Sequence, residues 1–187
     1  MTSAAFARPS LRAVPSEPAL YRKVLGHVPT PVCVVTASAP AGPVGVTVGS
    51  FTSVSLDPPL VVFYCGSGSV SAPAVIEAGS FCVNVLSEDQ DDLGLAFAGR
   101  SEDRFSSCSW RPGVSAAPQI EGASAWIDCV VEGSFPAGDH VAILGRVTSL
   151  AADGHRRPLI FYQGGMTRLD RASTRQVHSD SFAWWSG

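Results

Sequence analysis

The chain has 187 residues, of which 45% are hydrophobic and 16% are charged, with a formal net charge of −3 and an isoelectric point near 5.7. This length and apolar content predict one compact domain with a substantial core. The small negative charge argues against a nucleic-acid partner, because a phosphate backbone requires a clustered basic surface. No apolar run approaches the roughly 20 residues of a membrane-spanning helix, so no membrane partner is expected.

Five cysteines are scattered through the sequence without CxxC spacing or a neighbouring histidine pair. Neither a zinc site nor a disulfide framework is therefore predicted. Most of them lie in apolar runs such as VCVVT and FCVNVL, where a reduced cysteine packs as a small core residue. This usage favours a reducing, cytoplasmic location. Residues 1–18 lack the apolar segment of a secretory signal and are expected to form a loosely ordered tail.

The first predicted elements are a short helix and a hairpin. Residues 18–26 place Leu20, Val24 and Leu25 on one side of an amphipathic helix that ends at Gly26. Residues 32–37, VCVVTA, are typical of a buried strand, and a loop at 41–43 returns the chain into a second strand.

The stretch at residues 45–59, GVTVGSFTSVSLDPP, is the most informative part of the sequence. Its valines favour an extended backbone, and its five hydroxyl side chains compete with a helix ladder for backbone groups. We interpret it as a strand that breaks into a loop, with hydroxyls and free amides facing a ligand. An ordinary polar turn between two strands is the alternative.

A glycine loop, GSGSVS at residues 66–71, follows a predicted strand at 60–65 and precedes a short helix and a strand at 80–86. Strand, loop, helix and strand resemble a dinucleotide-binding unit, but the helix has only about two turns and is too short to cross a sheet. We interpret the loop as a phosphate cradle at a helix N-terminus. A flexible glycine-serine turn is an equal alternative.

A second helix is predicted to begin with Ser87 as its N-cap and to end at Gly99. Its first turns carry four carboxylates that suit the helix dipole, Glu88, Asp89, Asp91 and Asp92. We interpret this cluster as capping and solvated surface rather than a metal site. Residues 100–119 show no regular period and are predicted to form a long loop anchored by Phe105 and Trp110.

Two strands, at residues 125–135 and 140–150, flank a turn in which Gly138 and Asp139 are the residue types of a two-residue hairpin. His140 follows this turn, where a lone histidine is usually just exposed. A last strand is predicted at 158–165. The polar tail after it carries Trp184 and Trp185, which are expected to dock on the same subunit or on a partner subunit.

Strands therefore dominate, and a closed or partly closed antiparallel barrel with a few short helices buries them without edges. In their order, these segments resemble the flavin reductase family, the small reductase components of two-component flavin-dependent monooxygenases. The matching segments cover residues 20–169 and are VCVVTA, GVTVGSFTSVSLDPPLV, the SxS of 69–71, FCVNVL, FAGRSEDRF, GDHVAILGRV and PLIFYQGG. The resemblance implies a mainly β, split antiparallel barrel of Greek-key, FMN-binding type at residues 19–169, tails at 1–18 and 170–187, and a homodimer.

The resemblance also implies an isoalloxazine ring held against the backbone of residues 46–50 and the hydroxyls of Thr47 and Ser50. Asp57 is expected to orient ring or ribityl groups, or else to cap its turn. The residues that the resemblance implies in cofactor binding are Val46, Thr47, Val48, Gly49, Ser50, Asp57, Cys65, Ser69, Ser71, Phe97, Ala98, Arg104 and His140.

The resemblance implies that three of these positions hold phosphate. Ser69 and Ser71 match the family's phosphate-contacting hydroxyls at the start of the short helix. Arg104 falls, with Phe97 and Ala98, in a segment expected to close over the flavin, and its forked guanidinium suits a phosphate. A surface ion pair with Glu102 or Asp103 is the alternative role for Arg104.

His140 matches the histidine of the family's Gly-Asp-His turn and is the implied catalytic residue, a neutral imidazole that donates a hydrogen bond to the nicotinamide carboxamide. The implied reaction transfers a hydride from NADH, or NADPH, to FAD or FMN, and reduced flavin then passes to a separate oxygenase. A non-catalytic flavin-binding or sensing barrel is one alternative. A Rossmann-type dehydrogenase, resting on residues 66–71 alone, is another.

Four positions depart from the family pattern. Gly49 replaces a serine, so the contact there is left to the backbone. Ser67 stands where a lysine or arginine is common, which weakens the phosphate site and leaves the choice between FMN and FAD open. Pro31 replaces a glycine and Met166 an aromatic residue, and both changes alter the expected roof of the pocket.

Overall fold

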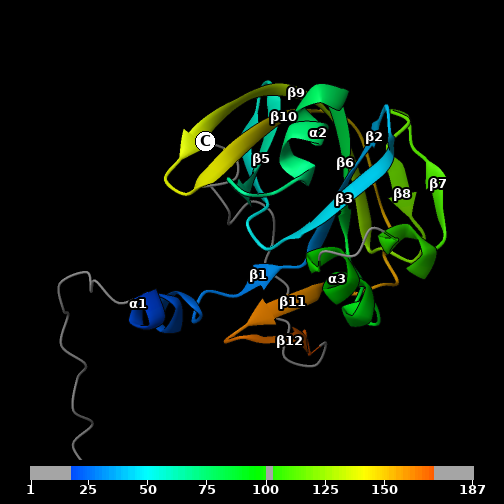
Figure 1. The fold of residues 1–187 in the computed structure, drawn as a ribbon. Coiled ribbons are helices and arrows are strands. Elements are labelled where there is room, and N and C mark those ends of the chain that lie inside the picture. The colour runs from blue at the N-terminus through cyan, green and yellow to red at the C-terminus, as the bar shows by residue number, and fades with distance from the viewer. Residues whose placement is uncertain (1–17, 100–102, 171–187) are drawn as a thin grey trace, which may run out of the picture.

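The computed structural model describes residues 18–99 and 103–170 (Figure 1). The predicted tails lie almost wholly outside these ranges, and so does the predicted docking of Trp184 and Trp185. Within the ranges, the helices are α1 (Pro18–Leu25), α2 (Ser71–Ala78), α3 (Asp91–Ala98) and the 3-10 helix η1 (Arg104–Ser107). The strands are β1 (Thr30–Pro31), β2 (Cys33–Ala39), β3 (Gly42–Val48), β4 (Thr52–Leu56), β5 (Pro59–Gly66), β6 (Ser80–Val85), β7 (Trp110–Pro112), β8 (Pro118–Ile120), β9 (Ala125–Ala137), β10 (His140–Ala152), β11 (Leu159–Tyr162) and β12 (Gly165–Arg168).

The main sheet has seven strands in the order β3-β2-β6-β9-β10-β5-β4, with a three-stranded sheet β1-β11-β12 beside it and a separate β7-β8 pair. Every strand pair in the described part of the chain is antiparallel. The mainly β, antiparallel prediction is confirmed. The Rossmann alternative is wrong, because β5 and β6, which flank the 66–71 loop, are separated in the sheet by β9 and β10.

The seven-stranded sheet curls until β3 approaches β5 (Figure 1). Ser50, two residues after the end of β3, forms a bridge to β5. The Ser50 hydroxyl accepts a hydrogen bond from the Tyr64 N–H at 3.0 Å and donates one to the Tyr64 carbonyl at 3.1 Å. A side chain, rather than a strand ladder, therefore joins the sheet at this point. This is also where residues 45–59 break from β3 into β4, as predicted.

Replacing Ser50 with alanine is expected to lower the free energy of unfolding by about 1–2 kcal/mol, because both backbone groups of Tyr64 lose their partner. Denaturant unfolding measures this change. Ser53→Ala, an exposed hydroxyl on the neighbouring strand β4, is the matched control and should leave the midpoint unaltered. Equal midpoints for the two variants would contradict the bridging role of Ser50.

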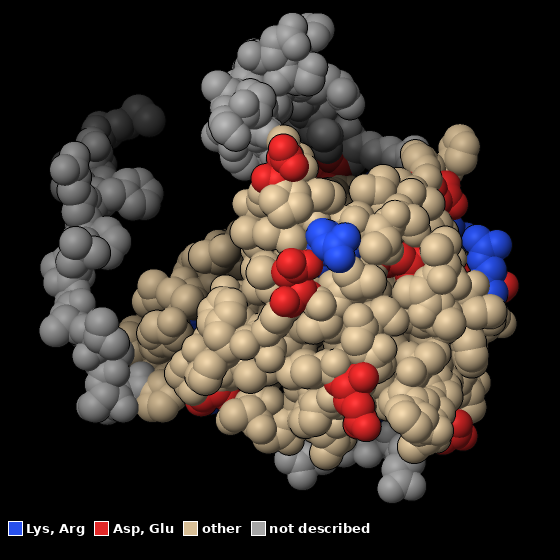
Figure 2. Space-filling view, turned by 90° about the horizontal axis from the view of Figure 1, so that it is seen from above, with Lys and Arg blue, Asp and Glu red and all other residues tan. Residues whose placement is uncertain are grey.

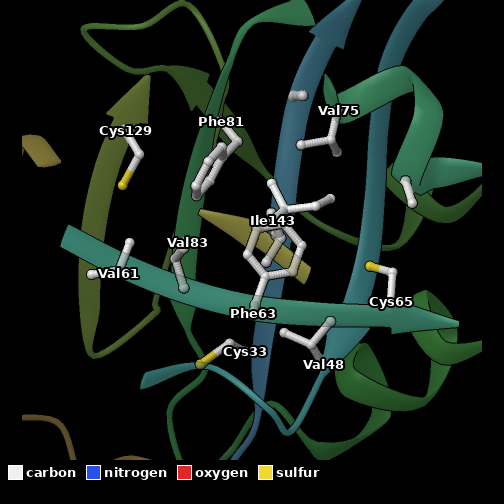
Figure 3. Packing of buried hydrophobic residues seen from close by; sticks show 13 residues of the cluster. Cys33, Val48, Val61, Phe63, Cys65, Val75, Phe81, Val83, Cys129 and Ile143 are labelled. Carbon is white, nitrogen blue, oxygen red and sulfur yellow. The ribbon is translucent and has the colours of Figure 1, made fainter. Parts of the chain in front are cut away.

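The barrel interior is filled by apolar side chains from the sheet and from α2 (Figure 3). Phe63 and Phe81 pack edge to face at its centre, with ring centroids 5.2 Å apart. All five cysteines are free thiols, and four of them are buried, which confirms the prediction that they are core residues. Burial raises the pKa of Cys33 and of Cys129 to about 12, so both thiols stay protonated at neutral pH.

The start of α3 differs from its prediction. The helix begins at Asp91, and Ser87 instead lies in an isolated bridge with Pro158, with its hydroxyl 2.7 Å from the Gly122 carbonyl and close to the Asp89 carboxylate. The N-cap assignment of Ser87 is therefore wrong, because tertiary partners engage its side chain. The expected end of the helix at Gly99 is confirmed.

The four carboxylates of the acidic cluster fall into two pairs with different environments. Asp91 and Asp92 lie in the first turn of α3, as predicted. The other two carboxylates form ion pairs with the segment before β11, Glu88 with Arg157 at 2.7 Å and Asp89 with Arg156 at 3.4 Å.

The region predicted as one long loop contains regular structure. Its described part includes η1 and the β7-β8 hairpin. The two predicted anchors do pack together, with the rings of Phe105 and Trp110 5.9 Å apart, and Phe105 also meets Phe97 at 5.0 Å. A second hairpin was not predicted: β11 turns into β12 through Gln163 and Gly164, both at positive φ.

The surface of the described residues is sparsely charged. On the face shown in Figure 2, acidic and basic side chains are scattered among uncharged ones and form no basic patch. None of the helices in the described ranges has the length and apolar character required to cross a membrane.

Candidate functional site

A cleft of about 1000 Å³ opens between the barrel and the segment that carries α1. One wall consists of residues 46–50 together with the end of β5 and Ser69. The opposite wall consists of α1, the loop after it, Phe161 and the β11-β12 turn, and His140 also lines the cleft. The volume is at the upper end of the range of about 300–1000 Å³ that is typical of ligand sites.

Eight of the thirteen residues predicted for cofactor binding line this cleft. They are Val46, Thr47, Val48, Gly49, Ser50, Cys65, Ser69 and His140. They come from the end of β3 and the two residues after it, from the end of β5 and the loop after it, and from the start of β10. The antiparallel pairing of Gly66 with His140 brings the last two strand ends together.

A second group of predicted residues meets beside the cleft, at the carbonyl of Gly45. The Ser71 hydroxyl donates to this oxygen at 3.2 Å, and Arg104 Nη1 donates to it at 2.7 Å. The Ser69 hydroxyl in turn accepts from the Ser71 N–H at 3.3 Å, at the start of α2. Arg104 Nε is buried and has no hydrogen-bond partner in the described part of the chain. The Arg104 guanidinium, the Ser69 hydroxyl and the N-terminus of α2 have the chemistry of a phosphate site. The one hydrogen of the Ser71 hydroxyl is already donated to Gly45, so the predicted contact of that hydroxyl with phosphate is not available in this arrangement.

The remaining three predicted residues do not line the cleft. Phe97 is 1% exposed and packs under Gly45, so it supports β3 from below. Ala98 is exposed at the end of α3. Asp57 is exposed in the β4-β5 turn, where a cis peptide bond joins it to Pro58.

The hydroxyls of Thr47 and Ser50 are already engaged within the protein. Thr47 donates to the Gly94 carbonyl at 2.8 Å, which ties β3 to α3, and Ser50 donates to Tyr64. A hydroxyl has one hydrogen, so both groups are left only with acceptor capacity toward a ligand. Hydrogen-bond donors on this wall must therefore come from other groups.

The backbone of β3 offers such donors. β3 is an edge strand of the sheet, and the Gly45 carbonyl points away from β2 toward Ser71 and Arg104. In an antiparallel strand the N–H and C=O of one residue point the same way, and every second residue repeats that direction. The N–H of Thr47 therefore faces the same free edge.

His140 has its ring orientation set by its neighbour. Its Nδ1 lies 2.7 Å from Asp139 Oδ1, and the two side chains are 47% and 93% exposed. Because a carboxylate only accepts, Nδ1 carries the hydrogen, and the neutral ring presents Nε2 as an acceptor. This refines the predicted interaction: a neutral His140 accepts from the amide N–H of a carboxamide, whereas donation to its oxygen requires the protonated ring.

The hydrogen bond from His140, followed by the charge of that ring, holds the pKa of the Asp139 carboxyl below its usual value. The carboxylate is therefore ionised throughout the neutral range. The Asp139 carbonyl also accepts a hydrogen bond from the Ser67 N–H at 2.9 Å, which links the turn to the glycine loop.

Cys65 lines the cleft but is only 3% exposed. Burial raises the pKa of its thiol to about 11, so no thiolate is available at neutral pH for nucleophilic or redox chemistry. In the described ranges, no group of histidine, cysteine and acidic side chains is placed to hold a metal ion.

The opposite wall of the cleft was not found by sequence reasoning. α1 was predicted as a helix, but its position depends on Gln163, whose N–H donates to the Gly26 carbonyl at 3.0 Å and whose side chain lies 3.0 Å from the His27 ring. The charged residues that line the cleft are Arg22 and Lys23, and no described carboxylate lines it. The basic pair within PALYRKVLG was the available signal.

The fold and the site define a flavin-binding protein of the split-barrel class. Residues 25–170 match the family model described as flavin reductase like domain. The chain is 47% identical over 150 residues to a flavin reductase of Pseudomonas putida, covering 80% of this chain and 88% of that protein. It is 39% identical over 164 residues to HsaB, the reductase subunit of a flavin-dependent monooxygenase of Mycobacterium tuberculosis, covering 87% of this chain and 88% of that protein.

A solved structure agrees with these relatives. The NADH:FAD oxidoreductase SgcE6 of Streptomyces globisporus, in complex with NAD and FAD fragments, superposes with a TM-score of 0.83 at 34% identity, covering 88% of this chain and all of that chain. The chain therefore belongs to the flavin reductase family, as its sequence resemblance predicted.

Proposed function

We propose that this protein is an NAD(P)H:flavin oxidoreductase that transfers a hydride from NADH, or NADPH, to FAD or FMN and supplies reduced flavin to a separate monooxygenase. We assign the activity to residues 19–169. The observation that carries the proposal is membership of the flavin reductase family over residues 25–170, a range that contains residues 46–50, Arg104 and His140. Relatives named as reductase subunits of monooxygenases support the separate partner.

The residues present suit a flavin and a nicotinamide. A bound flavin would supply the atom that accepts the hydride. The free edge of β3 would provide backbone donors for the ring's polar edge, while Ser69 and Arg104 would hold a phosphate at the start of α2 and Ser71 would fix the Gly45 carbonyl beside them. His140 would orient the carboxamide of the nicotinamide. Positioning of two reactants supplies most of the acceleration in such a reaction, so no protein nucleophile is required.

A titration of the purified protein with both flavins and both reduced nicotinamides tests the proposal. Oxidation of NADH or NADPH that depends on added flavin is expected. Flavin binding without any such oxidation would instead leave the second candidate, a non-catalytic flavin-binding barrel. The same titration decides between FAD and FMN.

Arg22 and Lys23 line the cleft, which supports a contact between this basic pair and the phosphates of the nicotinamide dinucleotide. Replacing both with glutamine is expected to raise KM for NADH by roughly fivefold to tenfold, the effect of two exposed charge contacts. The increase should shrink at high ionic strength. Steady-state kinetics measure it, with a phosphate-free dihydronicotinamide as the control substrate. An equal loss with that substrate would contradict a phosphate contact.

We further propose a homodimer. Exposed apolar side chains that do not line the cleft support an interface between subunits, and they are Val24 on α1 and Val54 and Leu56 on β4. Asp57 directly follows β4, so its predicted role toward flavin would require the cleft of the partner subunit. The mass of the protein in solution, from light scattering, tests the dimer, and a monomer mass would refute it.

We also propose that the protein works in the reducing cytoplasm. Support comes from its five cysteines, all of which are free thiols. Fractionation of cells that produce the protein tests this location, and recovery outside the cytoplasm would refute it.

A further inference from the structure

Gly49 lies at a crowded point of the cleft wall. A Cβ atom added to it would lie 2.9 Å from Thr30 Oγ1 and 3.6 Å from Thr30 Cβ. Its φ is not in the left-handed region, so the backbone conformation does not demand glycine. The Thr30 side chain thus occupies the space that a side chain at position 49 would take, and both residues line the cleft.

The Thr30 hydroxyl is available to a ligand. It forms no hydrogen bond with another residue in the described ranges, whereas the hydrogens of Thr47 and Ser50 are donated to Gly94 and Tyr64. Among these three hydroxyls around the 46–50 wall, Thr30 is therefore the one with a free hydrogen.

Thr30 is also held in place. It belongs to β1, where it pairs with Phe161 of β11, and the next N–H along, that of Val32, donates to the Leu159 carbonyl at 3.1 Å. Threonine is branched at Cβ and has few χ1 choices, so ordering its hydroxyl for a ligand costs little conformational entropy.

We propose that the Thr30 hydroxyl donates a hydrogen bond to the polar edge of the bound flavin ring, and that Gly49 leaves the space that this threonine requires. The inference rests on the proposed flavin site and deepens it. It replaces the expectation that the contact at position 49 comes from the backbone alone.

Binding of oxidised FAD and FMN, followed by flavin fluorescence without any nicotinamide, tests the proposal. Thr30→Val keeps the shape and removes the hydroxyl, and it is expected to weaken flavin binding about tenfold, the effect of one ordinary hydrogen bond. Thr30→Ala should behave in the same way. The matched control Thr30→Ser keeps the hydroxyl and should bind within about twofold of the unmodified protein. Flavin binding by Thr30→Val and Thr30→Ala at full affinity would overturn the proposal.

The coupling of the two positions gives an independent test. Gly49→Ser alone should weaken flavin binding, because its side chain meets Thr30. In a Thr30→Ala background the same substitution should restore binding, since a hydroxyl returns to the vacated space. Additive losses would overturn the steric coupling. Unfolding midpoints measured without flavin show whether a variant binds flavin weakly because it is misfolded or because it has lost a contact. Failure of the unmodified protein to bind any flavin would instead refute the proposed function itself.

Discussion

Replacing His140 with alanine is expected to lower kcat/KM for NADH by about 10–100-fold, while the affinity for flavin stays within about twofold. The reason is the position of the ring, at the rim of the cleft and held by Asp139 at 2.7 Å. In the proposed complex a side chain there would contact the nicotinamide, whereas the flavin phosphate would lie near Gly45. Pre-steady-state measurement of hydride transfer, together with flavin titration, separates the two effects.

His155 provides the matched control for this variant, because it is an exposed histidine that does not line the cleft. His155→Ala should retain normal turnover. A normal hydride-transfer rate combined with lost flavin affinity in His140→Ala would contradict the assigned role. Asp139→Ala should give an intermediate loss, since the ring keeps its contact atom but not its orientation.

The orientation that Asp139 provides has a defined pH dependence. The folded-state pKa of this carboxyl lies below its ordinary value, mainly through the hydrogen bond from His140. A carboxyl whose pKa is lower in the folded state stabilises the protein fully at pH values above its unfolded-state pKa. This stabilisation is lost as the pH falls through the folded-state pKa. The Asp139 carboxyl therefore stays ionised across the neutral range and is protonated only in acid.

Local sequence patterns were sufficient for most of the sheet. Residues 32–37 and 80–86 are apolar runs that become the buried strands β2 and β6, and Gly138 supplies the positive φ of the hairpin turn between β9 and β10. The errors lie where tertiary contacts decide. Ser87 has the residue type of an N-cap, but its hydroxyl reaches the carbonyl of Gly122, a partner that no local pattern reveals.

The site was predictable as a set of strand ends but not as a cleft. Residues 46–50 were singled out by their hydroxyl-rich pattern, whereas His140 was singled out only through the resemblance of its Gly-Asp-His turn to the flavin reductase family. The wall formed by α1 was missed because tertiary contacts of Gly26 and His27 with Gln163 bring it there. The hydroxyls of Thr47 and Ser50 were recognised by type, yet their hydrogen bonds to Gly94 and Tyr64 are visible only in the fold.

Replacing Gly45 with alanine is expected to destabilise the protein by about 2–3 kcal/mol, through overpacking of a buried site. The new Cβ would lie 2.5 Å and 2.7 Å from two ring atoms of Phe97, a side chain that is 1% exposed and packs on Phe105. Relief of this clash requires β3 and α3 to separate. The Gly45 carbonyl would then shift relative to Ser71 and Arg104, so flavin affinity should fall by about tenfold as well.

Two companion variants separate this clash from the general effect of adding a methyl group to a strand. Gly133→Ala places a Cβ on β9 where no atom lies within 4 Å. The free energy of unfolding should stay the same or rise by up to about 1 kcal/mol, because alanine loses less conformational freedom on folding than glycine does. Phe97→Leu shortens the side chain beneath Gly45, so the double variant should lose less stability than the two single variants combined. Urea unfolding and flavin titration measure both quantities. Equal stability of Gly45→Ala and Gly133→Ala would show that Phe97 yields without cost, and β3 would then not depend on that ring for its position.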